Sequence, residues 1–201
     1  MMNICFATNN LHKLEEVRNK VAPLSINISS LADIGCAEEL PETQDNIPGN
    51  SLQKAMYVFS NYHIPCFADD TGLEVSALNG EPGVYSARYA GPQRNSTDNI
   101  NLLLKNLEGV SNRAARFRTV ITLAGLTSQP VVFEGIVEGE IGLSPRGASG
   151  FGYDPVFAPT GQALTFAEMS MNEKNELSHR AIAVSHLVTF LANNFGMSKK
   201  S

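Results

Sequence analysis

The sequence has few cysteines, no excess of basic residues and no long apolar run. Its three cysteines are an odd number without a Cys-x-x-Cys pair, which argues against a disulfide framework or a thiolate zinc site and favours a reducing cytoplasm. Its 15 basic residues are outnumbered by 20 acidic ones, so we expect no nucleic-acid polymer as a partner. It starts without a basic n-region and an apolar h-region, and no stretch of about 18 apolar residues occurs, so we expect no secretory leader and no membrane partner.

Length and composition indicate a globular α/β protein. With 201 residues, 43% of them hydrophobic, the chain can bury roughly 70% of its unfolded surface in one core. Apolar patterns typical of strands and of helices alternate along it. We expect a single domain over residues 1–201, with two lobes around a central cleft.

The apolar patterns place the main elements. Strands are expected at residues 3–7, 65–68, 115–126 and 131–141, and a further strand with tight turns between 73 and 87. One helix is expected after Asn10, where Leu11, Leu14, Val17 and Val21 recur at helical spacing, and another has the apolar face Leu52, Ala55, Met56 and Phe59. A third is expected after a cap at Ser96 or Thr97, and the last from about Ser178 with the face Ala181, Val184, Val188 and Leu191. The Gly- and Pro-rich stretch 143–177 shows weak periodicity and is longer than most idle loops, so we suspect a function there.

The first strand-to-helix junction is a candidate phosphate site. First-turn N–H groups and the helix dipole favour an anion at the loop Thr8 to Leu11, and Lys13 would add a full positive charge. The alternative is that Asn10 only caps the helix and Lys13 is a solvated surface residue.

Asp69 and Asp70 are candidate metal-site acids, because they follow the strand expected at 65–68. Adjacent carboxylates of an extended chain point to opposite sides, so the two should have different partners. Mg²⁺ takes hard oxygen ligands and usually only one or two protein carboxylates. Glu42 is a candidate second ligand, although Glu38, Glu39 and Asp45 lie close to it in sequence. The alternative for Asp-Asp-Thr-Gly is an ordinary turn.

A candidate base site lies near the last helix. His179 and Arg180 fall in its first turn, where positive charge opposes the helix dipole and calls for compensation. Arg180 and Lys174 are donor-only groups suited to phosphate or carbonyl oxygens, and Phe151 or Tyr153 could stack on a purine. The alternative is that these aromatic residues, with Phe157, belong to the core. Glycines at 147, 150 and 152 permit close approach or positive φ, and Asp154 precedes Pro155 in an extended conformation that could present its carboxylate.

Five motifs together resemble the inosine/xanthosine triphosphate pyrophosphatase family over nearly the whole chain. They are Thr8-x-Asn10-x-x-Lys13, Ala68-Asp-Asp-Thr-Gly-Leu-Glu-Val, Leu78-Asn-Gly-Glu-Pro-Gly-Val-Tyr-Ser-Ala-Arg-Tyr-Ala-Gly, Gly150-Phe-Gly-Tyr-Asp-Pro and Lys174-Asn-Glu-Leu-Ser-His-Arg. The resemblance implies an α/β fold with a long mixed sheet flanked by helices, two lobes around a cleft, and a homodimer. It also implies Mg²⁺-dependent hydrolysis of non-standard purine nucleoside triphosphates (ITP, dITP, XTP) to the monophosphate and pyrophosphate, which cleanses the nucleotide pool.

The resemblance also implies roles for single residues. The triphosphate would be held by Thr8, Asn9, Asn10, Leu11, His12 and Lys13. Mg²⁺ would be bound by Glu42 and Asp70, with Asp70 also the catalytic proton acceptor and Thr71 in contact with the substrate. The base pocket would consist of Phe151, Gly152, Tyr153, Asp154, Lys174, His179 and Arg180, with Phe151 stacked on the purine and the basic residues at its 6-oxo group.

Two positions depart from the family pattern. Asn9 stands where the family often has Gly, so a position that tolerates positive φ would use Asn here. Gly49 stands where the family often has a second Glu, which removes any metal or water contact of that acid. Two other functions stay open: a related pyrophosphatase with another nucleotide preference, and a nucleotide sensor that binds a triphosphate without hydrolysing it.

Overall fold

The computed structural model describes residues 2–196. The chain divides into two compact units. Unit 1 comprises Met1–Asp70, Val120–Glu134 and Ala183–Ser201, and unit 2 comprises Thr71–Thr119 and Gly135–Ile182.

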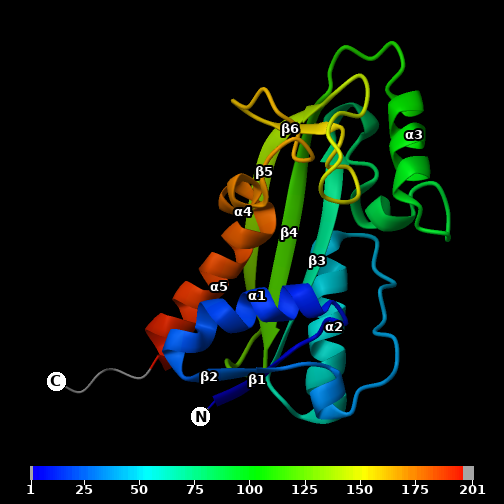
Figure 1. Ribbon diagram of the computed structural model, residues 1–201. Helices are drawn as coiled ribbons and strands as arrows, with labels where there is room; N and C mark the ends of the chain where they lie inside the picture. The colour runs from blue at the N-terminus through cyan, green and yellow to red at the C-terminus, as the bar shows by residue number, and fades with distance from the viewer. Residues whose placement is uncertain (1, 197–201) are drawn as a thin grey trace. The chain divides into compact units, whose positions relative to one another are not determined.

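The described strands form one mixed sheet in the order β2-β1-β3-β4-β5-β6 (Figure 1). Their bounds are β1 Met2–Phe6, β2 Ile26–Ser29, β3 Cys66–Val75, β4 Ala114–Ala124, β5 Val131–Ile141 and β6 Phe157–Pro159. Strand β1 pairs in parallel with β2 and β3, whereas β5 pairs antiparallel with β6. The expected α/β class with a long mixed sheet is confirmed.

In unit 1, helix α1 (Leu11–Val21) follows β1 and packs beside β2, as Figure 1 shows. The helix forms because Leu14, Val17 and Val21 recur on one face, and all three are buried against the apolar side chains of β1 and β2. The helix expected after Asn10 is therefore confirmed, but Leu11, expected with the same apolar residues, is exposed.

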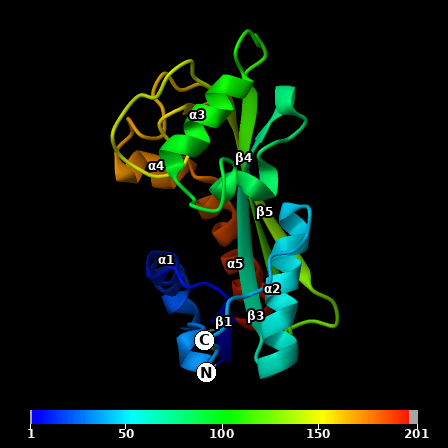
Figure 2. The same cartoon turned by 90° about the vertical axis from the view of Figure 1, so that its right-hand side faces the viewer.

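Helix α2 (Ile47–Tyr62) runs beside the first part of β3 in both views (Figures 1 and 2). It begins where Asn46 accepts a hydrogen bond from the Gly49 N–H and Pro48 fits the first turn. The expected apolar face is wrong in part, since Leu52 is exposed. The buried face instead carries Ile47, Asn50, Ser51, Lys54, Ala55 and Val58.

In unit 2, helix α3 (Ser96–Asn106) packs against the short 3₁₀ helix Gly83–Arg88. Its cap is Asn95, whose side chain accepts from the Asp98 N–H, so the expected cap at Ser96 or Thr97 is off by one or two residues. Helix α4 (Met171–Leu177) arises in the stretch expected to be irregular, and a capping box between Ser170 and Glu173 starts it.

Helix α5 (His179–Phe195) begins at the expected position. Its buried residues in unit 1 are Ala183, Val184, Leu187 and Leu191, so the expected face is right at Val184 and Leu191 and rotated elsewhere. Among residues 2–196, every helix is too short or too polar to cross a membrane.

Candidate active site

Asp69 and Asp70 lie in the middle of β3, not at its end. The expected strand end at these acids is wrong, and so is the alternative of a turn. Leu73 and Val75 continue the alternation beyond the acids and are fully buried, so packing extends the strand past them.

The two adjacent carboxylates have different partners, as extended backbone requires. Asp69 Oδ2 lies 2.8 Å from Lys13 Nζ, whereas Asp70 Oδ1 lies 3.6 Å from Lys54 Nζ. Side-chain exposure also differs, at 3% for Asp69 and 15% for Asp70. The site therefore pairs each acid with its own lysine and leaves Asp70 the more accessible of the two.

Lys54 is a functional candidate that the sequence reasoning missed. It is only 8% exposed, and its ammonium lies 2.6 Å from Glu42 Oε1 as well as near Asp70. Burial lowers the pKa of Lys54, but Asp70, Asp69 and Glu42 together outweigh this and raise the pKa above its ordinary value. Lys54 is therefore a fixed positive charge among three carboxylates.

The loop that carries Glu42 is clamped onto α2 by side-chain hydrogen bonds. The Thr43 N–H donates to Gln53 Oε1 (2.9 Å), and Gln53 Nε2 donates back to Thr43 Oγ1 (2.8 Å). The Gln44 N–H donates to Asn50 Oδ1 (2.9 Å). These bonds hold Glu42 next to Lys54 of α2. This contact distinguishes Glu42 from Glu38, Glu39 and Asp45, which looked equivalent in the sequence.

Gly49 lets this loop fold tightly onto the start of α2. A Cβ at position 49 would lie 2.8 Å from Gln44 Cβ, closer than real Cβ contacts. Gly49 stands where the family often has Glu, and the loop conformation seen here leaves no space for a side chain at this position.

The junction after β1 is ordered by its own side chains. Thr8 Oγ1 accepts from the Asn10 N–H (3.2 Å), and Asn10 Oδ1 accepts from the Lys13 N–H (3.2 Å). Asn10 therefore caps the helix, and its contact with a phosphate stays a prediction. The alternative that Lys13 is a solvated surface residue is wrong, because Lys13 is paired with buried Asp69.

The rest of the expected phosphate loop is exposed where it is described. Asn9 and Leu11 are exposed, and the side chain of His12 lies outside the described part of the structure. Within residues 2–196, positive φ at non-glycine positions occurs at Ser25, His63, Asn79 and Arg94. Asn9 is not among them, so replacing Gly by Asn costs no left-handed backbone strain.

Phe151 and Lys174 form an exposed aromatic–cation pair in unit 2. The Phe151 side chain is 68% exposed, and Lys174 Nζ lies 4.7 Å from the centre of its ring. Buried Asp154 accepts from Lys174 Nζ and from the Phe151 N–H, so its carboxylate fixes both residues rather than being presented to solvent. Gly150 has φ +81, and a Cβ there would collide with this carboxylate.

Tyr153 and Phe157 belong to the core of unit 2. Both are buried, the Tyr153 hydroxyl donates to the Ser86 carbonyl oxygen (2.9 Å), and burial raises the pKa of Tyr153. The core alternative is therefore confirmed for Tyr153 and Phe157, and contradicted for Phe151. Phe151 is left as the aromatic residue of this loop that can stack on a base, beside Gly152 with φ +59.

His179 and Arg180 occupy the first turn of α5, as expected. Ser178 Oγ caps the helix by accepting from the Ala181 N–H (3.1 Å). His179 is buried, and its Nδ1 lies 2.6 Å from Thr119 Oγ1 on β4. The sequence reasoning missed Thr119, since a threonine at an inward position of a strand gives no signal by itself.

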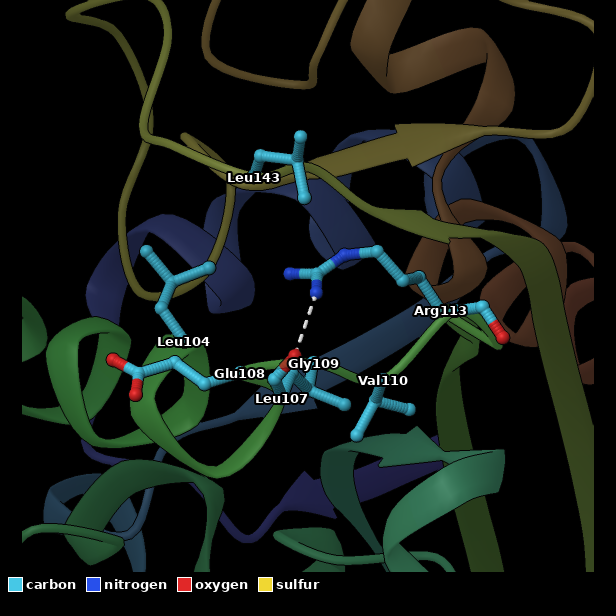
Figure 3. Close-up of a pocket in the computed structure, with 8 residues that line it drawn as sticks. Leu104, Leu107, Glu108, Gly109, Val110, Arg113 and Leu143 are labelled. Atoms are coloured by element: carbon cyan, nitrogen blue, oxygen red, sulfur yellow. Dashed lines mark hydrogen bonds between the residues drawn. The ribbon is translucent and has the colours of Figure 1, made fainter.

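A different pocket of unit 2 lies between the end of α3, the residues just before β4 and Leu143 after β5, and has a volume of about 310 Å³ (Figure 3). Arg113 points into it, but its guanidinium donates to the carbonyl oxygens of Leu107, Ile141 and Gly142 at 3.1, 2.6 and 2.8 Å. The pocket contains none of the expected site residues, and its cation is committed to backbone oxygens.

Comparisons with known proteins agree over nearly the full chain. The model of the Ham1 family matches residues 4–190. A protein of Flavobacterium johnsoniae named dITP/XTP pyrophosphatase is 53% identical over 190 residues, which cover 94% of this chain and 98% of that protein. A protein of Porphyromonas gingivalis with the same name is 51% identical over 192 residues, covering 95% and 98%.

Two solved structures have the same fold. The Ham1 protein of Staphylococcus aureus has a TM-score of 0.91 at 35% identity and covers 95% of this chain and 98% of its own. A HAM1 protein of Coxiella burnetii has a TM-score of 0.92 at 36% identity, with coverages of 96% and 100%.

Proposed function

The chain belongs to the Ham1 family, and we propose that it hydrolyses ITP, dITP and XTP to the nucleoside monophosphate and pyrophosphate. The observation that carries this proposal is the charge cluster of unit 1, in which Lys13 faces Asp69 and Lys54 lies between Glu42 and Asp70. A pure triphosphate binder gains little from three acids near its anion, whereas a site that also takes a cation needs them.

Glu42 and Asp70 suit Mg²⁺, because both present hard carboxylate oxygens and already converge on one positive charge, that of Lys54. Bound there, Mg²⁺ would neutralise phosphate charge and act as a Lewis acid. No group of three or more His, Cys, Asp or Glu side chains within residues 2–196 forms a ready cage for a metal. A site of one or two carboxylates is what Mg²⁺ uses when phosphate oxygens and waters complete its shell.

Asp70 is the proposed proton acceptor. It would take the proton of the attacking water as the water oxygen bonds to the α-phosphorus and the bond to the β-phosphate oxygen breaks. Its greater exposure supports this role over Asp69, whose carboxylate is buried against Lys13. Lys13, at the start of α1, would stabilise the departing pyrophosphate.

The exposed pair in unit 2 would bind the purine. Phe151 offers its ring for stacking, and Lys174, His179 and Arg180 supply donors for a 6-oxo group. Adenine carries a 6-amino group and would leave those donors unpaired, so it should be rejected. Guanine shares the 6-oxo group, and its rejection depends on its 2-amino group.

A panel of triphosphates tests the proposed function. We expect pyrophosphate release from ITP, dITP and XTP that requires Mg²⁺ and stops with EDTA, with kcat/KM for ATP lower by about 10²-fold. Preference for ATP would refute the polarity argument. Saturable binding without pyrophosphate release would favour the nucleotide sensor, and preference for a modified pyrimidine would favour the related pyrophosphatase.

Replacing Phe151 by Ala should raise KM for ITP about tenfold, because base–aromatic stacking contributes about 1–3 kcal/mol. The free energy of unfolding should hardly change, since Phe151 is exposed. Tyr153→Phe is the matched control: it removes the bond to Ser86 and should lower stability by about 1 kcal/mol without changing KM. Urea denaturation and steady-state kinetics measure both; a raised KM only in the Tyr153 variant would reverse the assignment.

The remaining expectations are a homodimer, a cytoplasmic location and a role in cleansing the nucleotide pool. The family resemblance supports the homodimer and the role in the nucleotide pool, and the sparse cysteines support the location. Light scattering on the purified full-length chain measures the oligomeric state directly.

A further inference from the structure

Three side chains of unit 2 form a continuous hydrogen-bonded chain. Thr71 Oγ1 lies 2.8 Å from Thr119 Oγ1, which lies 2.6 Å from His179 Nδ1. Thr119 is fully buried, and the His179 ring is stacked on Phe117 with centroids 4.9 Å apart and planes at 21°. Stacking on Phe117 and the hydrogen bond at Nδ1 therefore fix the orientation of the imidazole.

The number of protons available to these three side chains limits the tautomer of His179. The Thr119 hydroxyl has one proton and can donate to only one of its two neighbours. If it donates to His179 Nδ1, then Thr71 donates to Thr119 and the ring proton lies on Nε2. If Nδ1–H donates instead, Nε2 carries a lone pair, and one of the two threonine hydroxyl protons must find an acceptor outside these three side chains.

The count of protons favours the first direction for a neutral ring. The imidazole is buried against Phe117 and lies in the first turn of α5, where the helix dipole disfavours an added positive charge. In the first direction, Thr71 donates its hydroxyl proton to Thr119, and Thr119 donates its own to His179 Nδ1. The reverse direction would require an acceptor outside the three side chains for one of these two protons.

We propose that Thr119 is a specificity-determining positioning residue, which holds His179 in the tautomer with its proton on Nε2. This inference rests on the proposed function and deepens it. A fixed Nε2–H donates to the 6-oxo group of hypoxanthine or xanthine and meets the 6-amino group of adenine donor to donor. Without the bond from Thr119, the ring can exchange tautomers and present a lone pair to adenine.

Long-range ¹H–¹⁵N spectra of the full-length chain labelled with ¹⁵N-histidine test the tautomer without any substrate. We expect the wild-type His179 to carry its proton on Nε2, Thr119→Val to give a mixture of tautomers, and Thr119→Ser to restore the wild-type spectrum. A wild-type ring protonated on Nδ1 would overturn the proposal, even if the Val variant does not fold.

Kinetics supply the second measurement. Thr119→Val should lower the ratio of kcat/KM for ITP over ATP about tenfold, and Thr119→Ser should keep it. Thr122→Val is the matched control, because Thr122 is a buried threonine of the same strand that bonds Ser51 instead. In this variant the tautomer of His179 and the ratio of kcat/KM for ITP over ATP should be those of the wild type. An unchanged ratio and tautomer in Thr119→Val would refute the role of Thr119. If the wild type hydrolyses no ITP, the proposed function fails, while the spectra still decide the tautomer.

Discussion

Replacing Asp70 by Asn should lower kcat/KM for ITP by about 10³-fold at saturating Mg²⁺. Asn keeps the shape of the side chain but has neither the negative charge for a metal nor the basicity to accept a proton. The fold should persist, because Lys54 keeps Glu42 as a partner at 2.6 Å. Pyrophosphate release measures the rate, and urea denaturation checks the fold.

Asp69→Asn is the matched control for Asp70→Asn. It frees Lys13 from its 2.8 Å ion pair and should reduce kcat/KM by only about tenfold, since Lys13 remains available to phosphate. Near wild-type turnover of Asp70→Asn would remove Asp70 from both proposed roles. The larger loss in Asp69→Asn would instead assign the proton transfer to Asp69.

Elements with simple apolar periodicity could be predicted from the sequence. Strand β5 has the expected bounds, and α1 buries Leu14, Val17 and Val21 of the four apolar residues that the spacing indicated, whereas Leu11 is exposed. The opposite partners of Asp69 and Asp70 also follow from strand geometry alone, even though the strand was expected to end there.

The buried face of α2 could not be found by apolar periodicity, because the helix buries polar side chains. Leu52 suggested the wrong face, whereas Ser51 and Lys54 lie inward. Lys54 is seven residues after Ile47 and four before Val58, a helical spacing that places it on their face and could have signalled its burial. Its partners come from a distant loop and strand, which only the folded chain brings together.

Local capping and loop packing account for the other errors. Helix α4 is short and depends on the capping box of Ser170 and Glu173 more than on apolar spacing. Phe151 and Tyr153 are two residues apart in one loop, yet one is exposed and the other is core. Glycines with positive φ on either side of Phe151 turn the backbone, so neither strand nor helix periodicity applies.

Lys54→Met should cause the largest loss of stability among these variants, about 3 kcal/mol, because it leaves the half-buried carboxylate of Asp70 without its lysine. Since the folded pKa of Lys54 is raised, its stabilisation is present below the ordinary lysine pKa and is lost only as the pH rises above it. Urea denaturation in EDTA measures the loss, and added Mg²⁺ should recover part of it if Glu42 and Asp70 bind the ion.

Lys20→Met, which breaks the surface pair with Glu16, should cost less than about 1 kcal/mol and show no such recovery. Equal losses in the two variants would contradict the buried charge cluster, and recovery in neither would contradict the metal site.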